Sequence, residues 1–149
     1  MIEQQLRALG IELPVPKTPV ANYLGSKRAG DLLFVSGRVS ELRGEVGTDV
    51  SRDEAREAAR LTLIDILAII RADLGDLDSI VSVEKMNGFV RSSPTFTEQP
   101  YVIDGASDLW VELLGEPGRH ARTATGVAQL PFGAAVQLEM VLGLSQSER

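Results

Sequence analysis

The sequence contains no cysteine and only one histidine among its 149 residues. The lack of cysteine excludes disulfides, thiolate nucleophiles and cysteine-bound zinc. A single histidine argues against a histidine-rich metal site and against a Ser-His-Asp relay elsewhere in the chain. We therefore expect a protein without a metal or other cofactor.

Basic residues and long apolar runs are also scarce. The chain has 15 Lys and Arg against 21 Asp and Glu, a formal net charge of -6 at pH 7, and a pI near 4.8. Phosphate binding needs clustered Lys and Arg, so we expect no nucleic-acid surface. No run of about 18 apolar residues could cross a bilayer, and the first residues lack the pattern of a signal peptide. We expect a cytoplasmic protein with no membrane partner.

Apolar residues make up 44% of the chain and charged residues 24%, which suits a single globular domain over residues 1–149. Hydrophobic periodicity and turn residues divide this domain into helices and strands. The expected elements are helix 2–9, strands 18–26 and 32–39, helix 51–74, strand 79–90, helix 98–114 and two strands within 120–142. Helices that cover one face of a sheet give an α+β domain.

Local signals fix some of these elements closely. Ser51 and Glu54 form a capping box, which predicts the start of the long helix. Thr97 is a candidate cap for the next helix, and Gly105 inside that helix should cost roughly 1 kcal/mol relative to alanine. In strand 79–90, alternation places Val81, Val83 and Phe89 on one side.

The C-terminal stretch reads as two strands that pair as a hairpin. Pro131 fixes φ at the turn and Gly133 permits positive φ. The second strand alternates, with four apolar side chains on one face and mixed side chains on the other. The apolar set is Val136, Leu138, Met140 and Leu142. Arg122 in the first strand is difficult to bury without an anionic partner, which a ligand or an acidic side chain could supply.

Several separated motifs resemble the Rid family of reactive enamine and imine deaminases, also called YjgF-like. They are Ala21-Asn22-Tyr23, Phe34-Val35-Ser36-Gly37, Arg122, Leu130-Pro131 and the alternating strand that carries Glu139. The resemblance implies a chorismate-mutase-like fold, in which two helices pack on one face of one sheet, and a homotrimer. Some Rid-like proteins are named endoribonucleases, but the acidic charge argues against that activity here.

The resemblance also implies a site for a small carboxylate-bearing metabolite. Arg122 matches the arginine that holds the substrate carboxylate, while Gly37 and Ala124 match positions that donate backbone N–H groups. Tyr23, Ser36 and Phe132 are the expected pocket residues. For Arg122 a structural ion pair is the alternative, and for Phe132 a place in the core. Tyr23 is equally well interpreted as an edge residue, and Ser36 and Gly37 as a strand-ending turn. Trp110 is expected in the core.

Gln137 departs from the family pattern, because active deaminases carry at this position a glutamate that positions or activates water. Glutamine can orient a water but cannot take its proton. Glu139 lies two residues further along the same strand face and is the substitute candidate. His120 shares the face of Arg122 and is a conceivable acid or base, although a solvated strand start is the simpler interpretation.

Two functions follow. The chain could hydrolyse small 2-imino or 2-enamino acids to 2-keto acids and ammonia, with Arg122 holding the carboxylate and Gln137 or Glu139 serving the water. Alternatively, it could be a non-catalytic trimer that binds small carboxylates as a sensor or regulator. Gln137 favours the second function. If the first is correct, Gln137→Glu should raise turnover.

Overall fold

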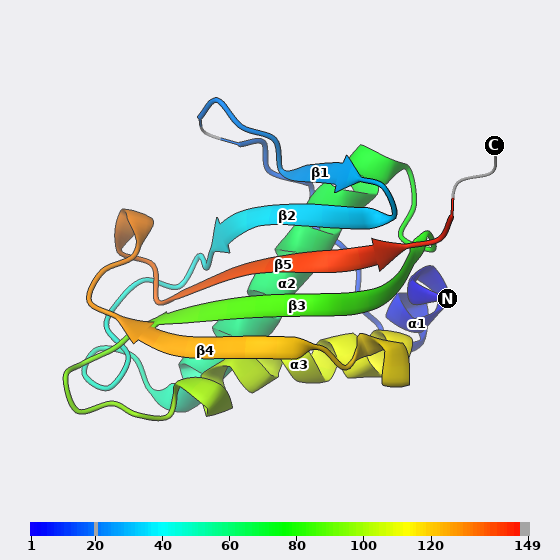
Figure 1. The fold of residues 1–149 in the computed structure, drawn as a ribbon. Coiled ribbons are helices and arrows are strands. Elements are labelled where there is room, and N and C mark those ends of the chain that lie inside the picture. Colours follow the sequence, from blue (N-terminus) through cyan, green and yellow to red (C-terminus); the bar gives the residue numbers. More distant parts are fainter. Residues whose placement is uncertain (20, 147–149) are drawn as a thin grey trace.

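The computed structural model describes residues 1–19 and 21–146 and shows one sheet with helices on one face (Figure 1). In chain order the elements are α1 (Ile2–Ala8), β1 (Ser26–Ala29), β2 (Leu32–Val39), α2 (Arg52–Leu74), β3 (Ile80–Arg91), α3 (Gln99–Leu114), the 3-10 turn η1 (Glu116–Gly118), β4 (Ala121–Val127), the 3-10 turn η2 (Pro131–Gly133) and β5 (Val136–Leu144). This order and the α+β class confirm the sequence-based prediction. In the described part of the chain, no helix combines the length and the apolar character needed to cross a lipid bilayer.

The five strands have the order β1-β2-β5-β3-β4, with β3 and β4 parallel and every other neighbouring pair antiparallel. β1 and β2 form the expected N-terminal hairpin. β1 begins only at Ser26, however, so the strand predicted from Thr18 is much shorter, and Val20 within that prediction lies outside the described residues. The preceding segment contains Pro14, Pro16 and Pro19, which cannot donate to a strand ladder.

The predicted hairpin within residues 120–142 is wrong, because β3 lies between β4 and β5. Pro131 and Gly133 do turn the chain, with Gly133 at φ 71°, but the connection crosses the end of β3. There the N–H of Arg91 donates to the carbonyl of Ala135 at 2.9 Å. Turn residues allow the chain to reverse direction, but they do not determine which strand it then pairs with. β3 has the buried Met86 and Val90 and is paired along both edges.

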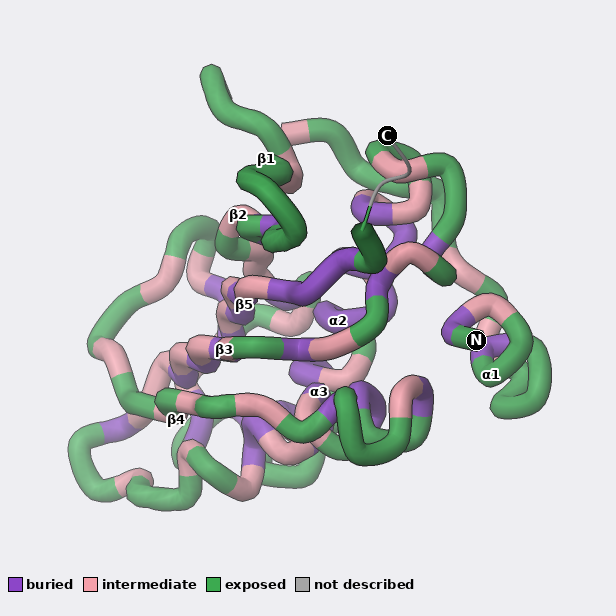
Figure 2. Tube along the Cα trace, turned by 45° about the vertical axis from the view of Figure 1, so that its right-hand side comes forward, coloured by how far each residue is buried: buried purple, intermediate pink, exposed green. Residues whose placement is uncertain are grey.

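α2 and α3 cover the same sheet face and bury the core between themselves and the strands (Figures 1 and 2). The capping box of Ser51 and Glu54 is present as predicted, with both reciprocal hydrogen bonds formed. The proposed cap at Thr97 is wrong, because α3 has Glu98 at its N-cap and no side-chain cap bond. Pro100 occupies its first turn, where a missing N–H costs no helical hydrogen bond.

The alternation predicted for β5 is correct. Val136, Leu138, Met140 and Leu142 are all buried, while Gln137, Glu139 and Val141 are only partly covered. In β3 the prediction fails for Val81, which is 45% exposed, and for Phe89, which does not share the buried face of Val83. Two register shifts near Ser82 and Glu84 exchange the faces along this strand.

No described helix covers the opposite face of the sheet, which is turned toward the viewer in Figure 1. Large apolar side chains remain accessible there. Phe34 of β2 is 47% exposed and lies beside Val141 of β5, while Leu32 is 39% exposed. Such a surface is typical of a face that associates with another chain. We refer to it below as the open face.

Candidate functional site

Arg122 projects from β4 toward α3, where an acidic side chain meets it. Its Nη1 lies 2.6 Å from Oδ1 of Asp104 and 3.1 Å from the hydroxyl of Ser107. Its Nη2 is 3.5 Å from the carbonyl of Pro100. The side chain is 23% exposed and that of Asp104 is 40% exposed, so this ion pair is open to water on one side. The alternative of a structural ion pair therefore holds within one chain.

Ser107 joins Arg122 to the only histidine of the sequence. The Ser107 hydroxyl lies 2.9 Å from Nε2 of His120, and Nδ1 of His120 lies 2.7 Å from the carbonyl oxygen of Gly118. His120 is only partly exposed and is hydrogen-bonded at both ring nitrogens. The simpler interpretation of His120 as a solvated residue at a strand start holds in part, because the ring is partly exposed directly before β4 but is also hydrogen-bonded. We call Asp104, Ser107, His120 and Arg122 the arginine cluster.

The sequence-based analysis missed Asp104 and Ser107. The two residues are three positions apart on α3 and therefore lie on the same side of the helix. A signal was available, because this polar pair lies beside the apolar stripe of α3, the helix that precedes the strand carrying Arg122. What could not be read from the sequence was the parallel return of β4 beside β3, which brings that strand against α3.

Tyr101 and two arginines hold the start of α3 against α2. The guanidinium carbons of Arg52 and Arg56 each lie 4.6 Å from the centroid of the Tyr101 ring. Its hydroxyl donates to Asp53 at 2.5 Å, and this hydrogen bond raises the pKa of Tyr101 above its ordinary value. Cation–π contacts of this kind fix the turn of α3 that precedes Asp104.

A second group of expected site residues gathers near β2. Tyr23, Ser36 and Gly37 line a narrow pocket together with Arg38. The pocket holds about 20 Å³, which is room for one water molecule rather than for a metabolite. The Ser36 hydroxyl donates to the carbonyl of Leu24 at 2.5 Å. The interpretation of Ser36 and Gly37 as a strand-ending turn is wrong, because both lie inside β2, where the pairing with β5 shifts register between Val35 and Arg38. Within the described residues, Nε of Arg38 is buried without a hydrogen-bond partner.

Gln137 belongs to this second group. A Cβ built on Gly37 would lie 3.0 Å from Nε2 of Gln137, which places the glycine backbone directly against that amide. A side chain at position 37 would therefore push Gln137 away. We call Tyr23, Ser36, Gly37 and Gln137 the glycine cluster. Glu139 lies further along β5, where it accepts a hydrogen bond from Asn87 at 3.2 Å.

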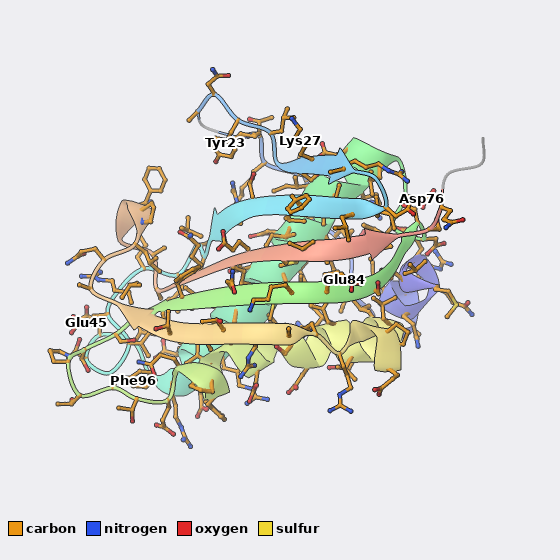
Figure 3. All side chains as sticks on the ribbon, in the orientation of Figure 1. Tyr23, Lys27, Glu45, Asp76, Glu84 and Phe96 are labelled. Carbon is orange, nitrogen blue, oxygen red and sulfur yellow. The ribbon has the colours of Figure 1, made fainter. Side chains whose placement is uncertain are left out.

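Within one chain the two clusters are separate. Arg122 and Ala124 lie on β4, whereas Gly37 lies on β2, with β5 and β3 between them. Three strand spacings amount to roughly 14 Å. Gln137 also faces away from the helices, whereas Arg122 faces α3. Tyr23 lies beyond the sheet edge formed by β1, across the sheet from β4 (Figure 3). A small ligand cannot contact both clusters of a single chain.

The remaining expected residues lie outside these clusters or at their border. Ala124 is partly buried against the core beside the arginine cluster. Phe132 is 65% exposed, so the alternative that it lies in the core is wrong, and its φ of 61° is a strained value for a residue other than glycine. Trp110 is fully buried, as predicted.

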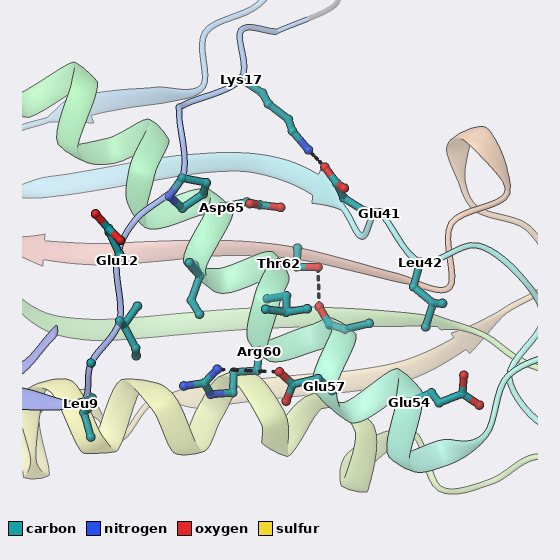
Figure 4. Close-up of a pocket in the computed structure, with 16 residues that line it drawn as sticks. Leu9, Glu12, Lys17, Glu41, Leu42, Glu54, Glu57, Arg60, Thr62 and Asp65 are labelled. Carbon is teal, nitrogen blue, oxygen red and sulfur yellow. Dashed lines mark hydrogen bonds and ion pairs between the residues drawn. The ribbon is translucent and has the colours of Figure 1, made fainter.

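A larger hollow lies elsewhere, between α2 and the segment that follows α1 (Figure 4). It measures about 800 Å³ and contains none of the expected site residues. Across its mouth Lys17 pairs with Glu41, and Arg60 lies 3.8 Å from Glu57. Burial raises the pKa of Asp65 in its wall, although the charges of Lys17 and Arg38 oppose this shift. Among the described residues, no group of three or more acidic or histidine side chains is arranged to hold a metal ion.

Comparison with known proteins agrees with this fold. Residues 3–142 match the model of the YjgF/chorismate mutase-like family. The chain is 43% identical to Protein TCP17 of Trypanosoma cruzi, with 97% of this chain and 94% of that protein aligned. It is 27% identical to a 2-iminobutanoate/2-iminopropanoate deaminase of Dermatophagoides farinae, with 89% and 93% aligned.

Among solved structures, the protein Atu1372 of unknown function from Agrobacterium tumefaciens superposes with a TM-score of 0.88. The two sequences are 46% identical, and the alignment covers 97% of this chain and 92% of that one. The family match thus spans nearly the whole chain and both clusters. The chain belongs to the YjgF/chorismate mutase-like family, as a divergent member of the Rid group that its motifs resemble.

Proposed function

We propose that this protein hydrolyses small 2-imino or 2-enamino acids to 2-keto acids and ammonia, with the substrate carboxylate bound by Arg122. The observation that carries the proposal is the orientation of the Arg122 guanidinium. Asp104 and Ser107 both engage Nη1, and within the described residues Nη2 has only the 3.5 Å contact with the carbonyl of Pro100. The Nε–Nη2 edge therefore remains available for a bidentate carboxylate.

Imine hydrolysis requires little from the protein beyond the orientation of the substrate and of a water molecule. An imine carbon conjugated to a carboxyl group is already electrophilic, so a bound carboxylate and a positioned water supply most of what hydrolysis needs. The relative named 2-iminobutanoate/2-iminopropanoate deaminase supports this substrate class. Arginine suits the role because its donors are fixed in a fork and stay charged at every physiological pH.

We further propose that the site is completed between copies of the chain in a homotrimer. The arginine cluster at the β4 edge of one copy would face the glycine cluster of the next, since one chain holds the two about three strands apart. The accessible Phe34 and Leu32 on the open face support association. In this arrangement Gln137 of a neighbour can orient water near the bound substrate, and Gln137→Glu should raise turnover.

A non-catalytic carboxylate-binding or regulatory trimer is the alternative, and Gln137 is the observation that favours it. An amide can hold a water by hydrogen bonding but cannot accept its proton. A protein that binds carboxylates without turnover would therefore use Arg122 in the same way as a deaminase. The two functions differ only in the release of 2-keto acid.

Calorimetry with pyruvate and 2-ketobutyrate tests the shared part of both functions. Arg122→Ala should weaken binding by about 1.5–3 kcal/mol, which is roughly 10- to 150-fold. Arg119→Ala is the matched control, because Arg119 is 70% exposed and pairs with Glu116 of the same turn. Unchanged affinity in Arg122→Ala would contradict the proposal at its central residue.

A further inference from the structure

We propose that Ser107 and His120 form a proton relay at the arginine cluster, which accepts a proton from the attacking water and returns it to the leaving nitrogen. This inference rests on the proposed imine hydrolysis at Arg122. It assigns to this chain the acid–base function that Gln137 cannot perform. The two side chains are contributed by α3 and by the residue directly before β4, and they meet only because that strand packs on the helix.

The hydrogen-bond partners of His120 determine which nitrogen is basic. A carbonyl oxygen can only accept, so the contact of 2.7 Å with Gly118 requires the proton of the neutral ring to be on Nδ1. Nε2 then carries the lone pair and accepts the hydroxyl proton of Ser107 across 2.9 Å. A base oriented in this way by a fixed backbone acceptor is the usual arrangement beside a reacting hydroxyl group.

Ser107 has one further position for a water molecule. A serine hydroxyl has one donor and two acceptor sites. The donor is directed to His120, and one acceptor site receives Nη1 of Arg122 at 3.1 Å. The last acceptor site can hold a water, next to the guanidinium whose other edge binds the carboxylate. Arg122, Ser107 and His120 are each partly exposed, so water can reach them.

The reaction then balances without any added group. The water oxygen bonds to the carbon of the protonated imine, the C=N electron pair moves to nitrogen, and a water proton passes through Ser107 to Nε2 of His120. In the second step the imidazolium returns this proton to the amine nitrogen. The C–N bond breaks with its electron pair on nitrogen, and as the C=O bond forms the hydroxyl proton passes through Ser107 to Nε2 of His120, which releases it to solvent. Protonated imine and water become 2-keto acid, ammonia and one proton.

The test measures 2-keto acid release from an imine that an amino-acid oxidase generates from alanine, beside calorimetry with 2-ketobutyrate. His120→Gln and Ser107→Ala should each lower kcat by about 100-fold or more, while the affinity for 2-ketobutyrate stays within threefold of the parent. His120→Ala with added free imidazole should regain part of the lost kcat, which a purely structural residue would not permit. Ser82→Ala, which removes a hydroxyl paired with Glu84 at the far end of β3, is the control and should change neither quantity.

The outcomes separate the two proposals. If the parent protein and both variants hydrolyse the imine equally well, the relay is wrong and imine hydrolysis stands. If the parent binds 2-ketobutyrate but releases no 2-keto acid, the relay and the deaminase function are wrong and carboxylate binding stands. If His120→Gln and Ser107→Ala lose 2-ketobutyrate binding together with kcat, their role is structural and the relay is overturned.

Discussion

Gly105 of α3 lies directly against the backbone carbonyl of Arg56 on α2, and a Cβ at this glycine would overlap that oxygen. The two helices can approach this closely only because position 105 has no side chain. Arg56 also pairs with Asp108 at 2.7 Å one turn further along α3, which holds the contact in register. The position of Asp104 and Ser107, and with it the orientation of Arg122, depends on this helix contact.

Gly105→Ala should therefore destabilise the protein, although alanine is the better helix former. Separating α2 from α3 costs about 1–3 kcal/mol, against a gain of up to about 1 kcal/mol in helix propensity. We expect a net loss of about 1–2 kcal/mol and a fall in Tm of roughly 2–8 °C in thermal unfolding. Val111→Ala, at a 40% exposed position of the same helix, should stay within about 0.5 kcal/mol. An unchanged or higher Tm for Gly105→Ala would show that the helices can separate freely.

Asp65 should make stability depend on pH in an identifiable direction. Burial raises its folded pKa above the unfolded value of 3.8, so folding favours the protonated form. This destabilising effect is absent below the unfolded pKa and grows as pH rises through the folded pKa. Asp65→Asn should therefore raise Tm at pH 7 and lose this advantage near pH 3.5. Glu112→Gln, at an exposed position on α3, is the control. An equal gain at both pH values would mean that the charge of Asp65 is not the cause.

The open face should direct assembly. Phe34→Glu places a charge at a 47% exposed apolar position that pairs with Val141, and burying it against another copy would be costly. Light scattering of the parent should give three times the chain mass of 16.1 kDa, and Phe34→Glu should give the single-chain mass. Leu61→Glu, at a 50% exposed position of α2 on the helix side, should remain a trimer. A parent mass of 16.1 kDa at micromolar concentration would refute the homotrimer.

Gln137→Glu tests whether the glycine cluster of one copy lies against the arginine cluster of the next. A glutamate there can accept a proton from water, so 2-keto acid release should rise while 2-ketobutyrate affinity changes by less than threefold. Calorimetry and the imine assay on the parent and the variant measure the two quantities separately. An unchanged rate would indicate that position 137 does not approach Arg122 of a neighbour. The glycine cluster would then have no part in turnover.

Much of the fold was predictable because its signals are local. The capping box at Ser51, the alternation along β5 and the apolar stripe of α3 each reflect the period of one element and its burial. The pairing of β4 was not predictable in this way, since turn residues at Pro131 and Gly133 fit a hairpin and a crossing connection equally well. Strand order depends on contacts between distant segments.

The same contrast between local signals and distant contacts applies to the candidate site. Arg122, Gly37 and Gln137 were predicted as site residues from motifs, but no motif indicates which residues lie together in one chain. The cost assigned to Gly105 from helix propensity did not include its contact with a carbonyl on another helix, which a Cβ would overlap. The Ser107–His120 contact likewise joins residues 13 positions apart through packing rather than through periodicity.

The position of β5 has a consequence for synthesis of the chain. Among the described residues β5 is the last strand in sequence, yet it lies between β2 and β3 and joins the two parts of the sheet. Until residues 136–144 leave the ribosome, the β1–β2 hairpin and the β3–α3–β4 unit have no strand to connect them, and both present unpaired edges. Completion of the sheet therefore requires contacts between residues distant in sequence, such as Asn87 with Glu139, 52 positions apart. A nascent chain that ends before Val136 would expose the unpaired edges of β2 and β3, and such edges favour aggregation.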